Sequence, residues 1–235
     1  MAVASTNHSS HFATNSVFVL TRAAATTWLA LRAVGNIATA DDMPTQSVLD
    51  AGALTRLVPL LDHEKKSIRK EACWTLSNIA AGKPAQIQCI LDGGFLTKLR
   101  RILIDSSDVA AQKEAAWTIA NVIAGGRTAQ ICAIVDANFV APLCDVATTR
   151  NLGPRTVAVV LSALEGILKE GVASKDLEAS AAGQPTEQAF RAVFEASGAR
   201  EKLEKLRFHQ DSDVVAKAET ICGSGGLLEA LFLNC

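Results

Sequence analysis

The chain has 235 residues, of which 49% are hydrophobic and 20% charged, and its formal net charge is -1 at pH 7. A chain of this length and composition can bury a sizeable core, and because apolar and polar residues do not alternate strictly, we expect an all-α fold. A net charge near zero excludes a general attraction to nucleic acid or to anionic membranes, so we expect neither partner. Any electrostatic recognition has to come from a local patch.

Residues 1–27 differ in composition from the rest of the chain. They are rich in Ser, Thr, Ala and Asn, they carry one basic residue, Arg22, and they carry no acidic residue. A transit peptide shares the low acidic and high hydroxyl content, but it usually contains more arginine. We therefore favour a disordered or low-complexity leader and keep targeting as the alternative.

An internal repeat follows the leader. The segments KEACWTLSNI at 70–79 and KEAAWTIANV at 113–122 are near-copies 43 residues apart, and LRAVGNI at 31–37 places Arg32 and Asn36 42 residues before Trp74 and Asn78. Periods of roughly 40 to 47 residues are typical of armadillo and HEAT repeats, in which one helical unit is stacked many times. In the first copy an arginine stands where the other two carry tryptophan.

The spacers between the copies also match one another, at 46–54, 88–96 and 132–140. Each spacer contains a residue that tolerates a positive φ, namely Gly52, Gly94 or Asn138, which predicts a short helix, a turn and a second helix. Together with the long helix of each copy this makes three helices per repeat. We therefore predict an all-α, right-handed armadillo-repeat superhelical solenoid.

This pattern predicts three regions. Residues 28–222 form a partial array of armadillo repeats after the leader, and residues 223–235 form a Gly-rich hinge and a short apolar tail. For the tail we favour a role in capping the exposed end of the array, and a misread terminus is the alternative.

The long helices have two distinct faces when sorted by the 3.6-residue period. In the copy around Trp74 the apolar stripe consists of Ala72, Leu76, Ile79 and Ala80. A second face carries Lys70, Glu71, Trp74, Ser77 and Asn78. The next copy places Glu114, Trp117 and Asn121 together in the same way. A polar and aromatic face that is repeated with the same spacing indicates a binding surface.

The residue types on this face suit one kind of ligand. Asparagine carries both a donor and an acceptor, which suits bonds to the backbone of an extended peptide. Tryptophan rings on either side can hold the aliphatic stem of Lys or Arg and attract its charge, and Glu71, Glu114 and Asp42 can supply carboxylates near the cationic head. The alternative is that the tryptophans cover the edge of the core and the asparagines bond neighbouring backbone.

The segments WTLSN at 74–78 and WTIAN at 117–121, each preceded by Lys-Glu-Ala, resemble the tryptophan/asparagine arrays of the importin α (karyopherin α) family. The resemblance covers about residues 30–222 and weakens after Gly153. It implies the C-terminal half of the family's armadillo array, with its minor signal-binding site. The residues implied at that site are Arg32, Asn36, Asp42, Glu71, Trp74, Ser77, Asn78, Glu114, Trp117 and Asn121. In the following repeat Leu161 and Glu165 replace the tryptophan and asparagine, so we expect the groove to end there.

The resemblance also implies function and partners. It implies a nuclear import adaptor that binds Lys/Arg-rich nuclear localisation signal peptides and works in both cytoplasm and nucleus. The C-terminal repeats are expected to meet the export receptor for importin α. Binding of importin β is doubtful, because residues 1–27 lack the family's basic N-terminal segment, and the earlier repeats that hold the major site are absent too. A fragment, a truncated gene and a short paralogue all remain open.

Other constellations carry little chemistry. The six cysteines form no Cys-x-x-Cys pair, so we expect reduced and mostly buried thiols. The four histidines have no ligand spacing, and we expect no metal and no cofactor. No nucleophile, base and orienting group share a motif, so we expect no enzymatic activity. The competing hypothesis for function is an armadillo scaffold that binds a folded protein partner and has no role in transport.

Overall fold

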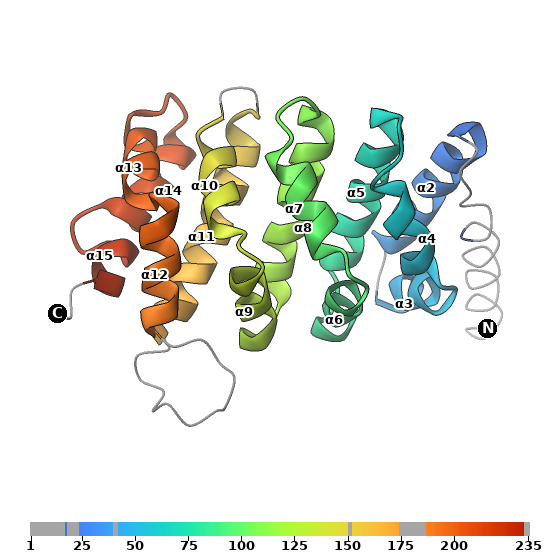
Figure 1. Ribbon diagram of the computed structural model, residues 1–235, viewed down its shortest axis with the longest axis horizontal. Coiled ribbons are helices and arrows are strands. Elements are labelled where there is room, and N and C mark those ends of the chain that lie inside the picture. The colour runs from blue at the N-terminus through green and yellow to red at the C-terminus, as the bar shows by residue number, and fades with distance from the viewer. Residues whose placement is uncertain (1–16, 18–23, 40–41, 150–151, 174–186, 233–235) are drawn as a thin grey trace. The chain divides into compact units, whose positions relative to one another are not determined.

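The computed structural model describes residues 17, 24–39, 42–149, 152–173 and 187–232. Every regular element in these ranges is a helix, and the chain divides into two compact units, residues 1–125 and 126–235, which are described separately. The helices of the first unit are α2 (Ala24–Ala38), α3 (Asp42–Asp50), α4 (Ala53–Leu60), α5 (Lys66–Ala80), α6 (Pro84–Asp92), α7 (Leu96–Ile104) and α8 (Val109–Gly125). The long helix α5 packs against α2 on one side and against α8 on the other (Figure 1).

The second unit repeats the same order of two short helices and one long one. Its elements are α9 (Thr128–Asp136), α10 (Val140–Ala147), α11 (Pro154–Ala173), α12 (Glu187–Ser197), α13 (Ala199–Glu204), the short 3-10 helix η1 (Lys205–Phe208), α14 (Ser212–Cys222) and α15 (Leu227–Phe232). The long α11 packs against both α10 and α14.

The predicted turns are confirmed. Gly52, Gly94 and Asn138 have φ angles of 77°, 72° and 59°, which is the left-handed region that most side chains avoid. Each lies between the two short helices of a repeat, before α4, α7 and α10. A residue that reaches this conformation at low cost lets the chain reverse there, which explains why the spacers share glycine or asparagine.

The predicted core stripe is also confirmed. Ala72, Leu76, Ile79 and Ala80 of α5 have no exposed surface. Between the stripe and the polar face lies Thr75, whose buried hydroxyl lies 3.2 Å from the carbonyl oxygen of Leu31 in α2. Thr118 of α8 repeats this bond to the carbonyl of Cys73 at 3.2 Å. Successive long helices are therefore joined by an apolar seam and by equivalent hydrogen bonds.

Two helices lie near the boundaries of the predicted regions. Helix α2 begins at Ala24, within the leader predicted for residues 1–27; the rest of the leader, apart from residue 17, lies outside the described residues. The tail contains α15, which buries Leu228 and Leu231 against α11, α12 and α14. The capping role of the tail stays a prediction.

The cysteine prediction is confirmed for the described residues. Cys73, Cys132, Cys144 and Cys222 are buried free thiols, and Cys89 is an exposed one. Burial raises the pKa of Cys132 to about 11 and that of Cys144 to about 12, so both stay protonated at neutral pH. Cys235 lies outside the described residues.

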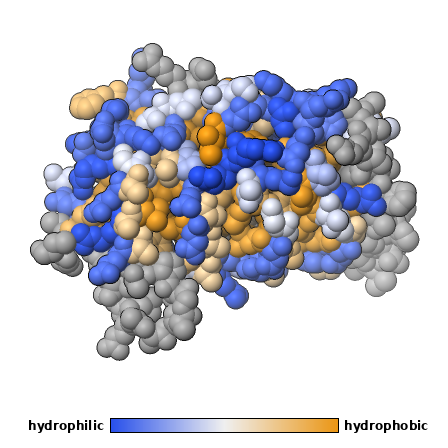
Figure 2. All heavy atoms as spheres, viewed as in Figure 1, coloured by the Kyte–Doolittle hydropathy of each residue, from blue (hydrophilic) through white to orange (hydrophobic). Residues whose placement is uncertain are grey.

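The surface of the helices is mixed in character. Figure 2 shows hydrophilic side chains over much of one face, with hydrophobic residues between them. Among the described helices no single one is long and apolar enough to cross a bilayer, although the bent pair α9 and α10 meets the criterion when the two are taken together. Within the described ranges no group of three or more His, Cys, Asp or Glu residues could hold a metal ion.

Candidate functional site

The predicted ladder residues occupy equivalent positions on three neighbouring long helices of the first unit. Arg32, Trp74 and Trp117 form one row, and Asn36, Asn78 and Asn121 form a second row one helical turn further on. The hydrogen bonds of Thr75 and Thr118 show that α2, α5 and α8 stack in the same register. The structure therefore brings both rows together on one face of this unit.

The asparagines are held by the backbone of the preceding long helix. The Nδ2 atom of Asn78 donates to the carbonyl oxygen of Gly35 at 3.1 Å, and Nδ2 of Asn121 donates to that of Ser77 at 2.8 Å. This is the alternative role that the sequence left open, and it uses one of the four bonds that each amide can make. Both side chains stay half-buried, so a second N–H and the carboxamide oxygen are left to meet a ligand. Asn36 is exposed.

Trp74 packs closely against α2. A Cβ atom added at Gly35 would lie 2.2 Å from Cζ3 of the indole, so only glycine leaves room for the ring there. The guanidinium carbon of Arg32 lies 4.6 Å from the centroid of the same ring, within the range of a cation–π contact. Contacts with α2 therefore cover part of Trp74, while Trp117 comes from α8 on the other side of α5.

Two of the predicted supporting residues are committed to contacts within the chain. Glu71 is only 3% exposed, and its carboxylate pairs with Arg32 at 3.4 Å and with Lys70 at 3.2 Å. Ser77 is also buried, and its hydroxyl donates to the carbonyl of Trp74 at 2.9 Å. Glu71 therefore neutralises two cations of its own fold, and its role toward a ligand stays a prediction.

Glu114 occupies the equivalent position on α8, but its environment differs. It is half-buried, and within the described part of the chain it forms no ion pair. Burial raises the pKa of this carboxyl above its ordinary value of 4.5; the charge of Lys70 lowers it and that of Glu71 raises it further. Glu114 is thus a carboxylate beside Trp117 that a cation would stabilise.

Asp42 lies at the start of α3, next to the second row at Asn78. Together with Thr39, Thr45 and Asn78 it lines a pocket of about 450 Å³. Its carboxylate already pairs with the Nζ atom of Lys83 at 2.7 Å, although both side chains are largely exposed. A ligand that reaches Asp42 therefore competes with an exposed lysine, and such pairs are weak.

Comparison with known proteins places this geometry in a family. Residues 41–81 match the model of the armadillo/beta-catenin-like repeat. The chain is 43% identical over 190 residues to importin subunit alpha-1b of Oryza sativa subsp. japonica, covering 80% of this chain and 34% of that protein. It is 45% identical over 195 residues to importin subunit alpha-3 of Arabidopsis thaliana, covering 82% of this chain and 35% of that protein.

By sequence, the chain belongs to the importin α family. It spans about a third of the length of these curated relatives, 34% in the case of alpha-1b.

Solved structures confirm the all-α armadillo-repeat fold. A designed armadillo repeat protein in complex with the peptide (KR)4 is similar with a TM-score of 0.75 and 28% identity, covering 93% of this chain and 81% of that one. A second designed armadillo repeat protein has a TM-score of 0.73 and 26% identity, covering 97% and 92%.

The repeat pattern of this importin α family member did not predict a role for one aromatic residue on the same face. Trp28 lies one turn before Arg32 on α2, is 41% exposed, and has its ring centroid 6.0 Å from the guanidinium carbon of Arg32. The equivalent positions in the next copies carry Lys70 and Lys113, so the repeat itself gave no signal for it.

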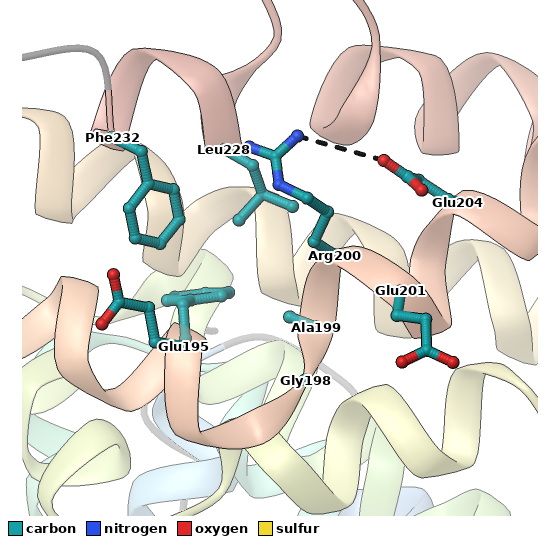
Figure 3. Close-up of a pocket in the computed structure, with 9 residues that line it drawn as sticks. Glu195, Gly198, Ala199, Arg200, Glu201, Glu204, Leu228 and Phe232 are labelled. Atoms are coloured by element: carbon teal, nitrogen blue, oxygen red, sulfur yellow. Dashed lines mark ion pairs between the residues drawn. The ribbon is translucent and has the colours of Figure 1, made fainter.

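The second unit contains a pocket that the sequence did not predict. It has a volume of about 520 Å³ and lies among α12, α13 and α15, where Phe232 and Leu228 face Glu195 and Arg200 (Figure 3). Arg200 pairs with Glu204 at 3.9 Å. The lining of this pocket combines the apolar side chains of Leu228 and Phe232 with charged residues such as Glu201.

Helix α11 carries other residue types at the two ladder positions. Leu161, which stands at the tryptophan position, has no exposed surface, and Glu165 at the asparagine position pairs with Lys169 at 2.7 Å. Neither residue presents an aromatic wall or a carboxamide.

Proposed function

We propose that this chain is a nuclear import adaptor whose first unit binds Lys/Arg-rich nuclear localisation signal peptides in an extended conformation. The observation that carries the proposal is the pair Trp74 and Trp117 at equivalent positions of adjacent helices, with the carboxylate of Glu114, which forms no ion pair with any residue that the structure describes, on the same helix as Trp117. Membership of the importin α family supports it, as does the similarity to a designed armadillo protein that was solved with the peptide (KR)4.

The proposed mode of binding uses each group for one task. A lysine or arginine stem lies between Trp74 and Trp117, where the ring faces attract its charge, and the cationic head reaches Glu114. The second N–H and the carboxamide oxygen of Asn78 and Asn121 bond the peptide backbone, so recognition of the main chain does not depend on its side chains. Because the existing bonds to Gly35 and Ser77 orient both amides in advance, little rotamer entropy is lost on binding.

The remaining parts of the proposal concern the cell. We place the protein in both cytoplasm and nucleus, as expected of an import adaptor. Contact between the C-terminal repeats and an export receptor stays a prediction, and it is separate from peptide binding because it involves other residues.

A titration tests peptide binding. The chain is titrated with a fluorescent peptide of eight alternating lysines and arginines, beside a Trp74→Ala/Trp117→Ala variant and a control variant, Phe208→Ala, that removes an aromatic side chain which is 90% exposed in the second unit. We expect binding that weakens with salt, is kept by the control and is largely lost by the double variant. Equal binding by all three proteins would refute the proposal and favour an armadillo scaffold without a role in transport.

A further inference from the structure

The first copy of the repeat departs from the other two at a pair of exposed positions. Trp28 and Leu29 stand on α2 where α5 and α8 carry a lysine followed by a glutamate. Both side chains are exposed, 41% for Trp28 and 64% for Leu29, although large apolar groups are usually buried. The start of α2 is therefore apolar at positions where α5 and α8 carry charged residues.

Arg32 lies between two aromatic rings on this face. Its guanidinium carbon is 4.6 Å from the centroid of Trp74 and 6.0 Å from that of Trp28, which is the outer limit of a cation–π contact. The same guanidinium pairs with Glu71 at 3.4 Å. Two aromatic walls and a carboxylate are the groups proposed above to bind a basic side chain of a peptide, and here they already hold a basic side chain of the protein.

We propose that Arg32 is the resident occupant of an aromatic slot formed by Trp28 and Trp74, so that a bound peptide places its basic residue between Trp74 and Trp117 and an uncharged, apolar residue against Trp28 and Leu29. This inference rests on the proposed peptide binding. It adds that the groove disfavours a basic peptide residue at the position next to Trp28 and Leu29.

The charge balance around the slot explains the rejection. Glu71 has 4% of its side chain exposed and is already paired with both Arg32 and Lys70, so it has little capacity for a third cation. A peptide lysine at this position would meet two like charges, whereas the exposed surfaces of Trp28 and Leu29 favour an apolar side chain. Glu114 differs, because within the described residues no cation is paired with it. Its carboxylate can therefore pair with a basic side chain of the peptide.

The inference is tested with a set of peptides in which one residue is substituted at each flanking position in turn, while a central basic pair fixes how the peptide lies in the groove. A nine-residue alanine peptide keeps a central Lys-Arg pair for the slot of Trp74 and Trp117, and a single Lys or Leu is moved through the flanking positions. For the native chain we expect one flanking position at which the Leu peptide binds more tightly than the Lys peptide by about threefold or more. Repulsion from the like charges and the loss of apolar contact with Trp28 weaken binding of the Lys peptide there by a factor of this order. In the Arg32→Gln variant, which keeps a donor for Glu71, the preference at that position should reverse in favour of Lys.

A control variant and a spectroscopic measurement separate the possible failures. Lys113→Gln removes one positive charge of the same face from α8, away from the slot, and should keep the preference for Leu. The Nε–H resonance of Arg32, assigned by its loss in Arg32→Gln, should show ring-current shifts that persist when the native chain is saturated with the Leu peptide.

Three results overturn the inference while leaving the proposed function intact. The first is the same Lys/Leu profile in the native chain and in Arg32→Gln. The second is a profile that Lys113→Gln changes as much as Arg32→Gln does. The third is movement of the Arg32 resonance to the position of a free arginine on saturation, which would show that the peptide displaces it. Loss of all binding by the native chain would instead count against the proposed function itself.

Discussion

Replacement of Gly35 by alanine tests whether the close packing of Trp74 on α2 holds the groove in shape. Gly35 lies inside α2, where alanine is normally the better residue by about 1 kcal/mol. The added Cβ atom would lie 2.2 Å from Cζ3 and 2.8 Å from Cε3 of the indole. Since carbon atoms prefer separations of about 3.5 to 4.0 Å, the ring has to move by roughly 1 Å or more.

The two effects have opposite signs, and their magnitudes decide the result. Overpacking of this kind costs about 1 to 3 kcal/mol, so we expect Gly35→Ala to lower the free energy of unfolding by up to about 2 kcal/mol despite the gain in helix propensity. In a Trp74→Ala background the obstacle is absent, and the same substitution should stabilise the chain by about 1 kcal/mol. The change of sign is the specific prediction.

Urea unfolding of the four proteins of this cycle measures the coupling between Gly35 and Trp74. Peptide titration of Gly35→Ala should show weaker binding than its stability loss alone explains, because the displaced ring carries the stack with Arg32. A coupling below about 0.5 kcal/mol together with native affinity would refute the packing argument, since independent sites add within that range.

Three further predictions concern other parts of the chain. Asp108→Asn should lower the free energy of unfolding by about 3 kcal/mol in urea, because it leaves the largely buried Arg69 without the carboxylate that lies 2.6 Å from its Nη2 atom; a loss below about 1 kcal/mol would contradict this. Glu114→Gln should stabilise the chain at pH values above the raised pKa of Glu114 and lose that gain as the pH falls from the raised pKa to 4.5, because the native carboxyl is then neutral as well; it should also remove the decline of peptide affinity that the native chain shows as acid protonates the carboxylate. Parallel pH profiles of both proteins would count against this. Leu228→Ala should cost about 3 kcal/mol if α15 caps the second unit, since the side chain has no exposed surface, whereas an unchanged urea midpoint would exclude that role.

The repeat frame could be predicted from the sequence because its determinants are local. The turns could be predicted from residues that adopt a positive φ at low cost, namely Gly52, Gly94 and Asn138. The apolar stripe that contains Leu76 and Ile79 could be predicted from the helical period. Such features need no knowledge of neighbours. They sufficed for the fold class and for the two rows of the site.

The state of each polar group could not be predicted in the same way. Glu71 and Glu114 occupy equivalent positions in nearly identical segments, yet Glu71 is buried and paired, whereas Glu114 is half-buried and has no ion pair among the described residues. The difference comes from α2, where Arg32 replaces tryptophan and reaches across to a residue 39 positions away. The helical period assigns residues to the faces of one helix, but it does not show which side chains of the neighbouring helix pair with them.

The distance between neighbouring long helices limits which peptide residues can contact successive rungs of the groove. Packed helices lie about 8 to 10 Å apart, and an extended chain rises about 3.3 Å per residue, so successive rungs meet every second or third peptide residue. The bonds of Asn78 and Asn121 fix the rungs to one another and prevent adjustment to a different interval. If Arg32 occupies the slot as proposed, it converts the rung on α2 from a site for positive charge into one that excludes it. The proposal therefore predicts a preferred peptide with a basic residue and an uncharged one two or three positions away, and it predicts weaker binding of an unbroken run of lysines.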